Sequence, residues 1–84
     1  MNITLKYFSW IRVKLKKSHD LIEVNQDISL KELKNNLISQ DAIYQEIFED
    51  KSVKFFLNLR EIDDENQTLN NGDILAFLPP VTGG

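Results

Sequence analysis

The sequence predicts a single α+β domain, in which one mixed sheet is covered by one main helix and one shorter helix. Apolar Ile3, Leu5 and Tyr7 alternate with other residues at the start of the chain, which is typical of a half-buried strand. A capped amphipathic helix begins at Ser29, and a last strand ends at Leu78. With 84 residues, the chain is long enough for one modest hydrophobic core and too short for two.

The composition excludes several classes of protein. Hydrophobic residues make up 42% of the chain and charged residues 27%, so a folded domain is expected and not a disordered segment. A net charge of −3 argues against a nucleic-acid-binding protein. No apolar run reaches the length of a membrane span, and the first residues lack the pattern of a secretory signal, so we expect a cytoplasmic protein. The absence of cysteine excludes disulfides, thiolate metal sites and a cysteine nucleophile.

A basic stretch lies between the first and second predicted strands. Phe8 comes after the first strand on its polar face, where it belongs either to a second small cluster or to a contact surface. Residues 12–17 hold four cations, and a solvated strand edge or hairpin arm is favoured over a phosphate-binding strip. Residues 21–24 form a second short strand, preceded by a turn that contains His19. This single histidine is a poor candidate for a metal or catalytic role, and no metal site is expected.

The helical region has clear start signals. Ser29 and Glu32 fit a capping box, in which each side chain accepts a hydrogen bond from the backbone of the other. Apolar residues of this helix fall on one face, at Leu30, Leu33, Leu37 and Ile38. Asp41 is expected to cap a second, shorter helix with a buried stripe of Ile43, Ile47 and Phe48.

The second half of the chain completes the sheet. Residues 53–59 give the longest strand signal and are interpreted as a central strand, with Phe56 placing an aromatic ring on its second face. Residues 60–68 form an acidic crossing, for which a solvated loop is favoured over a metal or acid–base site. Ile62 within it forms either a brief strand or an exposed apolar contact. Asn71 and Gly72 are a strong turn signal before the last strand, which covers residues 73–78.

If the two ends of the chain pair, the first and last strands run parallel at the sheet centre, and the capped helix crosses one face. This arrangement is a β-grasp, predicted for residues 1–78. Residues 79–84 then form an extended tail, because prolines cannot continue a strand or helix and glycines leave the backbone bare. Taken alone, such an end is more simply interpreted as frayed.

The C-terminal sequence adds a specific resemblance. The Asn71-Gly72-Asp73 turn, the strand of residues 74–78 and the ending Pro-Pro-Val-Thr-Gly-Gly resemble the small subunit of molybdopterin synthase, a sulfur carrier of the ubiquitin-like fold. The resemblance extends over the whole chain in its organisation and is most specific at the C-terminus. It implies that the reactive atom is the acyl carbon of Gly84.

The resemblance also implies partners. A ubiquitin-activating-type adenylyltransferase would use ATP to adenylate Gly84, and a sulfur donor would convert the product to a thiocarboxylate. The large subunit of molybdopterin synthase, with which the small subunit forms a heterotetramer, would hold the pterin precursor and supply the catalytic groups. The chain itself is expected to bind no cofactor, and to serve as a protein-borne substrate.

The same resemblance gives each tail residue and the second sheet face a role. Pro79 and Pro80 would keep the tail extended, Val81 and Thr82 would be gripped along a channel, and Gly83 would leave the Gly84 acyl group unhindered. A partner-docking surface is expected beside the tail at Phe8, Arg12, Ile62, Ile74 and Leu78. The alternative for these apolar residues is a second minor core under residues 60–68.

Three other functions stay open at this point. A ubiquitin-like modifier would use the same activation chemistry and end in an isopeptide bond from Gly84 to a lysine. A sulfur carrier for thiamine or another cofactor would share the fold and the Gly-Gly end. An interaction domain with an inert tail would need neither. The Pro-Pro-Val-Thr segment favours sulfur transfer for molybdopterin.

Overall fold

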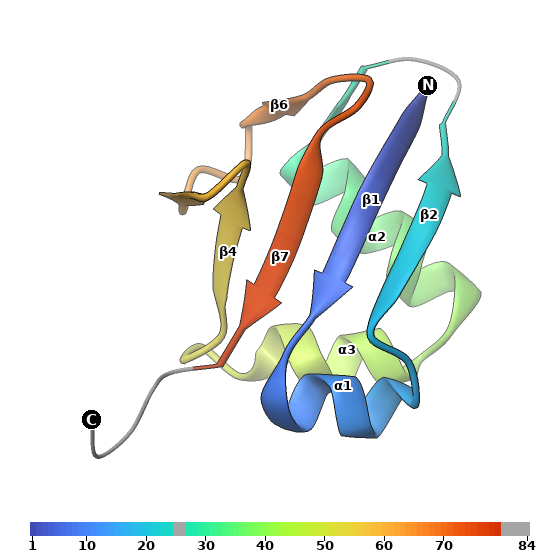
Figure 1. Ribbon diagram of the computed structural model, residues 1–84, viewed down its shortest axis with the longest axis vertical. Coiled ribbons are helices and arrows are strands. Elements are labelled where there is room, and N and C mark those ends of the chain that lie inside the picture. Colours follow the sequence, from blue (N-terminus) through green and yellow to red (C-terminus); the bar gives the residue numbers. More distant parts are fainter. Residues whose placement is uncertain (25–26, 80–84) are drawn as a thin grey trace.

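The computed structural model describes residues 1–24 and 27–79, and within these ranges it contains seven strands and three helices (Figure 1). In chain order they are β1 (Asn2–Tyr7), α1 (Ser9–Leu15), β2 (His19–Glu23), β3 (Ile28–Ser29), α2 (Leu30–Gln40), α3 (Ile43–Glu49), β4 (Lys54–Leu57), β5 (Arg60–Ile62), β6 (Thr68–Leu69) and β7 (Ile74–Leu78). In this part of the chain, no helix is both long and apolar enough to cross a membrane.

The main sheet has the strand order β2-β1-β7-β4-β5. β1 and β7 run parallel side by side at its centre, with Leu5 opposite Leu75, while β4 lies antiparallel to β7 (Figure 1). The predicted pairing of the two chain ends is therefore confirmed, and so is the mixed sheet of a β-grasp. The prediction of a central strand over residues 53–59 is wrong, because the strand ends at Leu57 and lies second from the edge.

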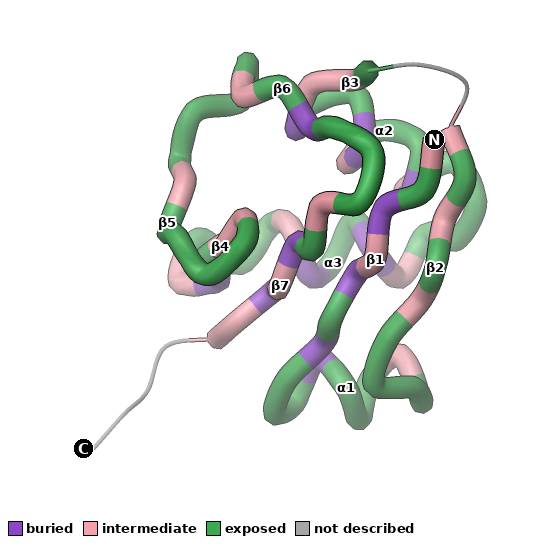
Figure 2. Tube along the Cα trace, turned by 45° about the horizontal axis from the view of Figure 1, so that its top comes forward, coloured by how far each residue is buried: buried purple, intermediate pink, exposed green. Residues whose placement is uncertain are grey.

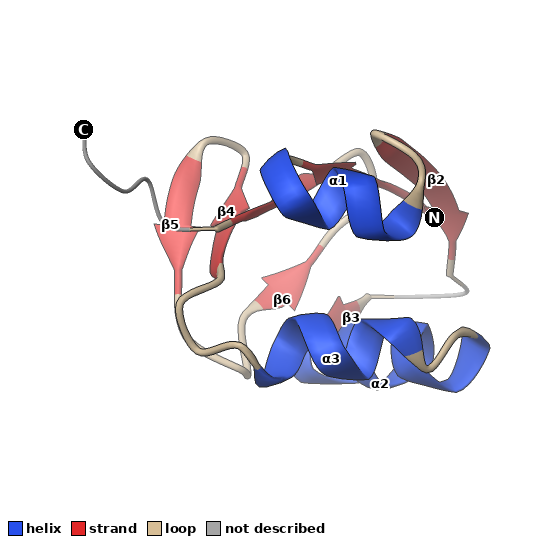
Figure 3. Cartoon of the chain, turned by 90° about the horizontal axis from the view of Figure 1, so that it is seen from below, coloured by secondary structure: helices blue, strands red, loops and turns tan. Residues whose placement is uncertain are grey.

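One face of the sheet forms the hydrophobic core. α2 and α3 lie in a layer against this face, and α1 lies across the end of the sheet at which β1 finishes (Figure 3). Along β1 and β7, buried residues alternate with more exposed ones (Figure 2). The most deeply buried side chains are Ile3, Leu5, Tyr7, Ile11, Leu30, Leu33, Ile47, Leu69, Leu75 and Phe77.

α1 replaces the strand edge or hairpin arm expected for the basic stretch. Ile11 is buried and Leu15, one helical turn later, packs against the core, so a 3.6-residue period is satisfied. The alternation of Val13 and Leu15 with cations is the pattern that suggested a strand. The helix ends at Lys16, whose left-handed φ of 62° lets its N–H bond back to the carbonyls of the last turn.

The remaining helix signals are close to expectation. Ser29 and Glu32 form the predicted capping box, with bonds of 2.9 and 3.1 Å between each side chain and the other residue's N–H. The Asp41 carboxylate accepts from the Ile43 N–H at 3.0 Å, although Ala42 is the N-cap of α3. His19 begins β2 and is exposed there, so its assignment to a turn is wrong.

The acidic crossing is partly ordered into strands. β5 pairs with β4, and β6 pairs with β3 in a separate two-stranded sheet. Ile62 therefore forms the brief strand that was one of its two expected states. In the described residues, no group of three histidine, cysteine, aspartate or glutamate side chains is placed to hold a metal ion.

The capping box provides a test of the local argument for α2. Ser29→Ala removes the oxygen that accepts from the Glu32 N–H, and should lower the free energy of unfolding by about 1 kcal/mol. Ser39→Ala, at an exposed site of the same helix, should change it by much less. Urea unfolding followed by circular dichroism measures both values, and equal losses would contradict a specific capping role.

Candidate functional site

β7 divides its side chains between the core and the outer face of the sheet. Leu75 and Phe77 are fully buried on the helix side, whereas Ile74, Ala76 and Leu78 alternate with them and face the other way. The strand leads directly to Pro79, the last described residue. This outer face therefore lies at the root of the C-terminal tail.

An apolar groove of about 480 Å³ occupies the outer face. Its lining comes from β1, the residue after it, β4, the β4–β5 turn and β7: Lys6, Phe8, Phe56, Asn58, Leu59, Ile74, Ala76 and Leu78. Strand pairing sets Ala76 between Lys6 on one side and Phe56 on the other. Lys6 is the only ionisable residue in this lining, and most of the other lining residues are apolar, so the groove has the chemistry of a binding surface.

The structure brings together three of the five residues predicted for partner docking. Phe8, Ile74 and Leu78 all line the groove, and Phe8 and Ile74 are each 41% exposed. Ile62 does not join them, because it pairs with Phe55 and packs against the core. Arg12 is exposed on α1, outside the groove lining. The docking role of all five residues stays a prediction.

The predicted tail residues fall mostly outside the described part of the chain. Pro79 is half-buried at the end of β7. Pro80, Val81, Thr82, Gly83 and the reactive Gly84 lie beyond the described residues, so their roles in threading and sulfur transfer stay predictions. The fold shows where the tail begins, which is the centre of the sheet beside the groove.

Half of the residues that line the groove are not predicted from the sequence, namely Lys6, Asn58, Leu59 and Ala76. The strand pattern of residues 53–59 predicts Leu59 within a strand, but it lies in the turn after β4 and is 97% exposed. Ala76 and Lys6 follow from strand alternation once β1 and β7 are paired. The sequence predicts Phe56 on the second face of its strand. It does not predict the pairing of Phe56 with Ala76, which brings Phe56 into the groove.

A network of hydrogen bonds attaches the β4–β5 turn to the start of β7. The Asn58 side-chain oxygen accepts from the Ile74 N–H at 2.9 Å, and the Asn58 N–H donates to the Ile74 carbonyl at 2.8 Å. The Asn58 amide also donates to Asp73 at 2.9 Å, and Asp73 in turn accepts from the Asn70 N–H at 2.7 Å. These contacts hold the groove wall and the strand that leads to the tail in one fixed arrangement.

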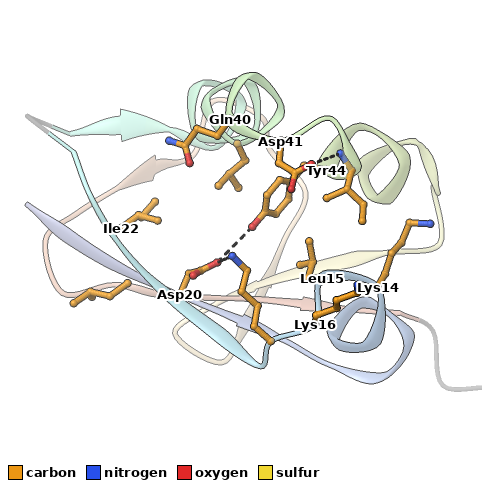
Figure 4. Close-up of a pocket in the computed structure, with 12 residues that line it drawn as sticks. Lys14, Leu15, Lys16, Asp20, Ile22, Gln40, Asp41 and Tyr44 are labelled. Atoms are coloured by element: carbon orange, nitrogen blue, oxygen red, sulfur yellow. Dashed lines mark hydrogen bonds and ion pairs between the residues drawn. The ribbon is translucent and has the colours of Figure 1, made fainter.

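A second hollow, of about 610 Å³, opens between α1, β2 and the α2–α3 connection (Figure 4). Asp20 and Tyr44 point toward one another across it. The Tyr7 hydroxyl donates to Asp20 at 2.7 Å and lies 2.9 Å from the Tyr44 hydroxyl, while Lys17 forms an ion pair with Asp20 at 2.7 Å. This network joins the α1–β2 segment to α3.

The protonation states of Tyr7 and Asp20 are those expected for a network that stabilises the fold. Burial raises the pKa of the Tyr7 hydroxyl, and its bonds to Tyr44 and Asp20 raise it further, so it stays protonated. Burial acts to raise the pKa of Asp20 as well, but hydrogen bonds from Lys17 and Tyr7 outweigh it and hold that pKa below its ordinary value. Asp20 is therefore ionised at neutral pH, with both its charge and its lone pairs engaged.

The fold and the groove define a class of protein: a β-grasp domain with an apolar sheet face beside the root of its C-terminal tail. The sequence model of the ThiS family matches residues 5–84, so the chain belongs to the ThiS family. Its fold is that of sulfur carriers of the ThiS and MoaD type. A comparison with curated protein sequences gives no match.

Solved structures share this fold over nearly the whole chain. A putative molybdopterin converting factor subunit 1 of Pyrococcus furiosus is 22% identical, with a TM-score of 0.81, over 96% of this chain and 99% of that chain. SAMP1 of Haloferax volcanii, 19% identical, has a TM-score of 0.81 over the full length of both. A complex of subunits 1 and 2 of molybdopterin-converting factor from Helicobacter pylori matches at 30% identity, with a TM-score of 0.72 over the full length of both chains.

Asp20 gives a pH-dependent test of the structural network. Because its pKa is lower in the folded protein, its ionised form stabilises the fold above pH about 4, and this contribution is lost as pH falls through the folded pKa. Asp20→Asn should therefore lower the free energy of unfolding by about 1 kcal/mol at pH 7. The difference from the natural protein should vanish in acid.

Urea unfolding between pH 3 and pH 7 would measure this difference. Asp63→Asn, at an exposed position, is the matched control and should change the free energy of unfolding by much less. A constant difference for Asp20→Asn at all these pH values would contradict the assigned pKa direction.

Proposed function

We propose that the chain carries sulfur as a thiocarboxylate on Gly84 and acts as the small subunit of molybdopterin synthase. The observation that carries this proposal is the ending Pro-Pro-Val-Thr-Gly-Gly, which directly follows the central strand of a ThiS-family domain. Because the chain has no cysteine, its terminal acyl group is the natural carrier of sulfur. The Helicobacter pylori complex, at 30% identity, favours the molybdopterin pathway and a large-subunit partner.

The proposed loading begins with a carboxylate, which is a poor electrophile. A ubiquitin-activating-type adenylyltransferase transfers AMP from ATP to Gly84 and releases pyrophosphate. The outer sulfur of a persulfide donor then attacks the acyl carbon and AMP leaves, which gives an acyl disulfide. A second thiol cleaves the sulfur–sulfur bond, so that a thiocarboxylate remains on Gly84 and the donor is left as a disulfide. The product is ionised at neutral pH and is a strong nucleophile.

In the proposed transfer, the thiocarboxylate sulfur attacks a side-chain carbon of a cyclic pterin phosphate held by the large subunit. The carbon–oxygen bond at that carbon breaks, and the oxygen leaves as water or stays on the phosphate as its ring opens. Water then cleaves the acyl–sulfur bond, so that the sulfur stays on the pterin and Gly84 returns to a carboxylate. A dithiolene needs a pair of sulfur atoms, and therefore a pair of loaded carriers. The groove contributes binding energy and orientation, while the acid and base groups come from the partner.

The groove supports docking by its position and composition. Phe8, Ile74 and Leu78 present an apolar surface beside the tail root, and apolar surface that is covered in a complex is a source of binding energy. Because Asn58 fixes the start of β7, a partner that binds the groove also fixes the direction from which the tail leaves. The same surface would be used in turn by the activating enzyme and by the large subunit.

A ubiquitin-like modifier is the second candidate function, and the likeness to SAMP1, a small archaeal modifier protein, favours it. Both functions need adenylation of Gly84, so activation alone does not separate them. They differ in the final acceptor, which is a lysine amine for a modifier and a pterin for the sulfur carrier.

Deletion of Gly84 tests the reactive atom. The shortened chain should lose sulfur transfer completely in a reconstituted reaction with the activating enzyme, ATP, a sulfur donor and the large subunit. Its thermal unfolding midpoint should match that of the full chain, because the core is formed by residues 3–77. Dithiolene formation by the shortened chain would contradict the proposal.

Leu78→Arg tests the groove. A cation at this position removes apolar surface from the site, and should abolish binding to the large subunit while leaving the circular dichroism spectrum unchanged. Leu21→Arg is the matched control, since Leu21 is 68% exposed on β2, outside the groove lining. Titration calorimetry measures both affinities. Normal binding by Leu78→Arg would show that the groove is not the docking site.

A further inference from the structure

The turn between β4 and β5 has an unusual residue at its second position. Asn58 and Leu59 are the central residues of this turn, and their φ values are 50° and 73°. Positive φ at both centres is the geometry of a tight hairpin, for which asparagine followed by glycine is the preferred pair. Asparagine tolerates this region, but a leucine side chain there is strained. Leu59 therefore lowers the stability of the turn relative to glycine.

Leu59 makes no compensating contribution to the core. Its side chain is 97% exposed, which is the highest value among the exposed large hydrophobic residues in the described part of the chain. Val13 and Leu21 follow at 73% and 68%. An apolar residue that strains the backbone and contacts little of its own domain has no role in folding. Strain retained in this way is found mainly where function requires it.

The surroundings of Leu59 make it a rigid projection from the groove. Asn58 is attached to Ile74 through its backbone and its side chain, so the turn cannot swing freely. Leu59 lines the same groove as Leu78, at the root of the tail. A partner that covers the groove would therefore meet Leu59 on a backbone that is already held in place.

The charges around the groove indicate what the partner surface contains. Lys6 lines the groove, Lys54 lies opposite Leu78 on the neighbouring strand, and Arg60 directly follows Leu59. All three are exposed, and none takes part in an ion pair between described residues. A complementary surface combines an apolar pocket with carboxylates at its edge.

We propose that Leu59 is a specificity-determining anchor, which enters an apolar, acid-rimmed pocket of the large subunit when the groove docks. This inference rests on the proposed function and adds to it a residue outside the predicted docking set. In this proposal, Leu59 lowers the stability of the free domain and raises its affinity for the large subunit. Removal of the Leu59 side chain should therefore weaken binding without lowering the stability of the free domain.

Leu59→Gly tests this trade directly. Glycine relieves the backbone strain and removes the anchor, so the thermal midpoint of the free domain should rise or stay unchanged. The affinity for the large subunit should fall roughly tenfold to a hundredfold, as expected for truncation of an interface anchor. Leu59→Met, which keeps a large apolar side chain, should bind within about twofold of the natural protein. Differential scanning calorimetry and titration calorimetry give the two readouts.

Each outcome bears on a separate claim. Normal affinity of Leu59→Gly would overturn the anchor and leave the proposed function in place, provided that the natural protein binds the large subunit and Leu78→Arg does not. A failure of the natural protein to bind the large subunit would overturn the proposed function, and the anchor with it. A marked loss of stability in Leu59→Gly would also overturn the inference, because Leu59 would then serve the fold.

Discussion

The parallel pairing of β1 and β7 at the centre of the sheet is the constraint on which the rest of the structure depends. It sets the first and last strands side by side, so that Phe8, after the first strand, and Leu78, at the end of the last one, line the same groove. It also makes the tail leave from the middle of the sheet. Without this pairing, the groove would lose one of its walls, and the tail root would have no fixed position.

The same strand contributes to the core on one face and to the groove on the other. Leu75 and Phe77 pack under the helices, while Ile74 and Leu78 line the groove, and the alternation of side chains along a strand makes this division possible. The polar network of Tyr7 and Asp20 lies in a separate hollow, where it stabilises the α1 end of the molecule. Under the proposed function, a reactive tail beside an apolar docking face would suit a protein that binds two enzymes in turn.

The sequence predicts the fold well where local signals and global pairing agree. The capping box at Ser29, the turn at Gly72 and the prolines after Leu78 have specific physical causes, and they were sufficient for the β-grasp. α1 was missed because it has only seven residues and no side-chain cap, while Val13 and Leu15 imitate a strand period. Leu59 was misplaced since leucine is not a turn signal. Without the turn at Leu59, the sequence does not predict that Ile62 pairs with Phe55 and therefore lies on the core side of the sheet.

The central claim is that Gly84 carries sulfur, and the intact mass of the protein tests it most directly. The chain should be produced in cells that contain the sulfurating pathway, and purified without the acidic or oxidising steps that destroy a thiocarboxylate. The account predicts a mass increase equal to the replacement of one oxygen by sulfur, located at Gly84 by fragmentation. An unmodified C-terminus under these conditions, or Gly84 found only in isopeptide bonds to lysines, would contradict it.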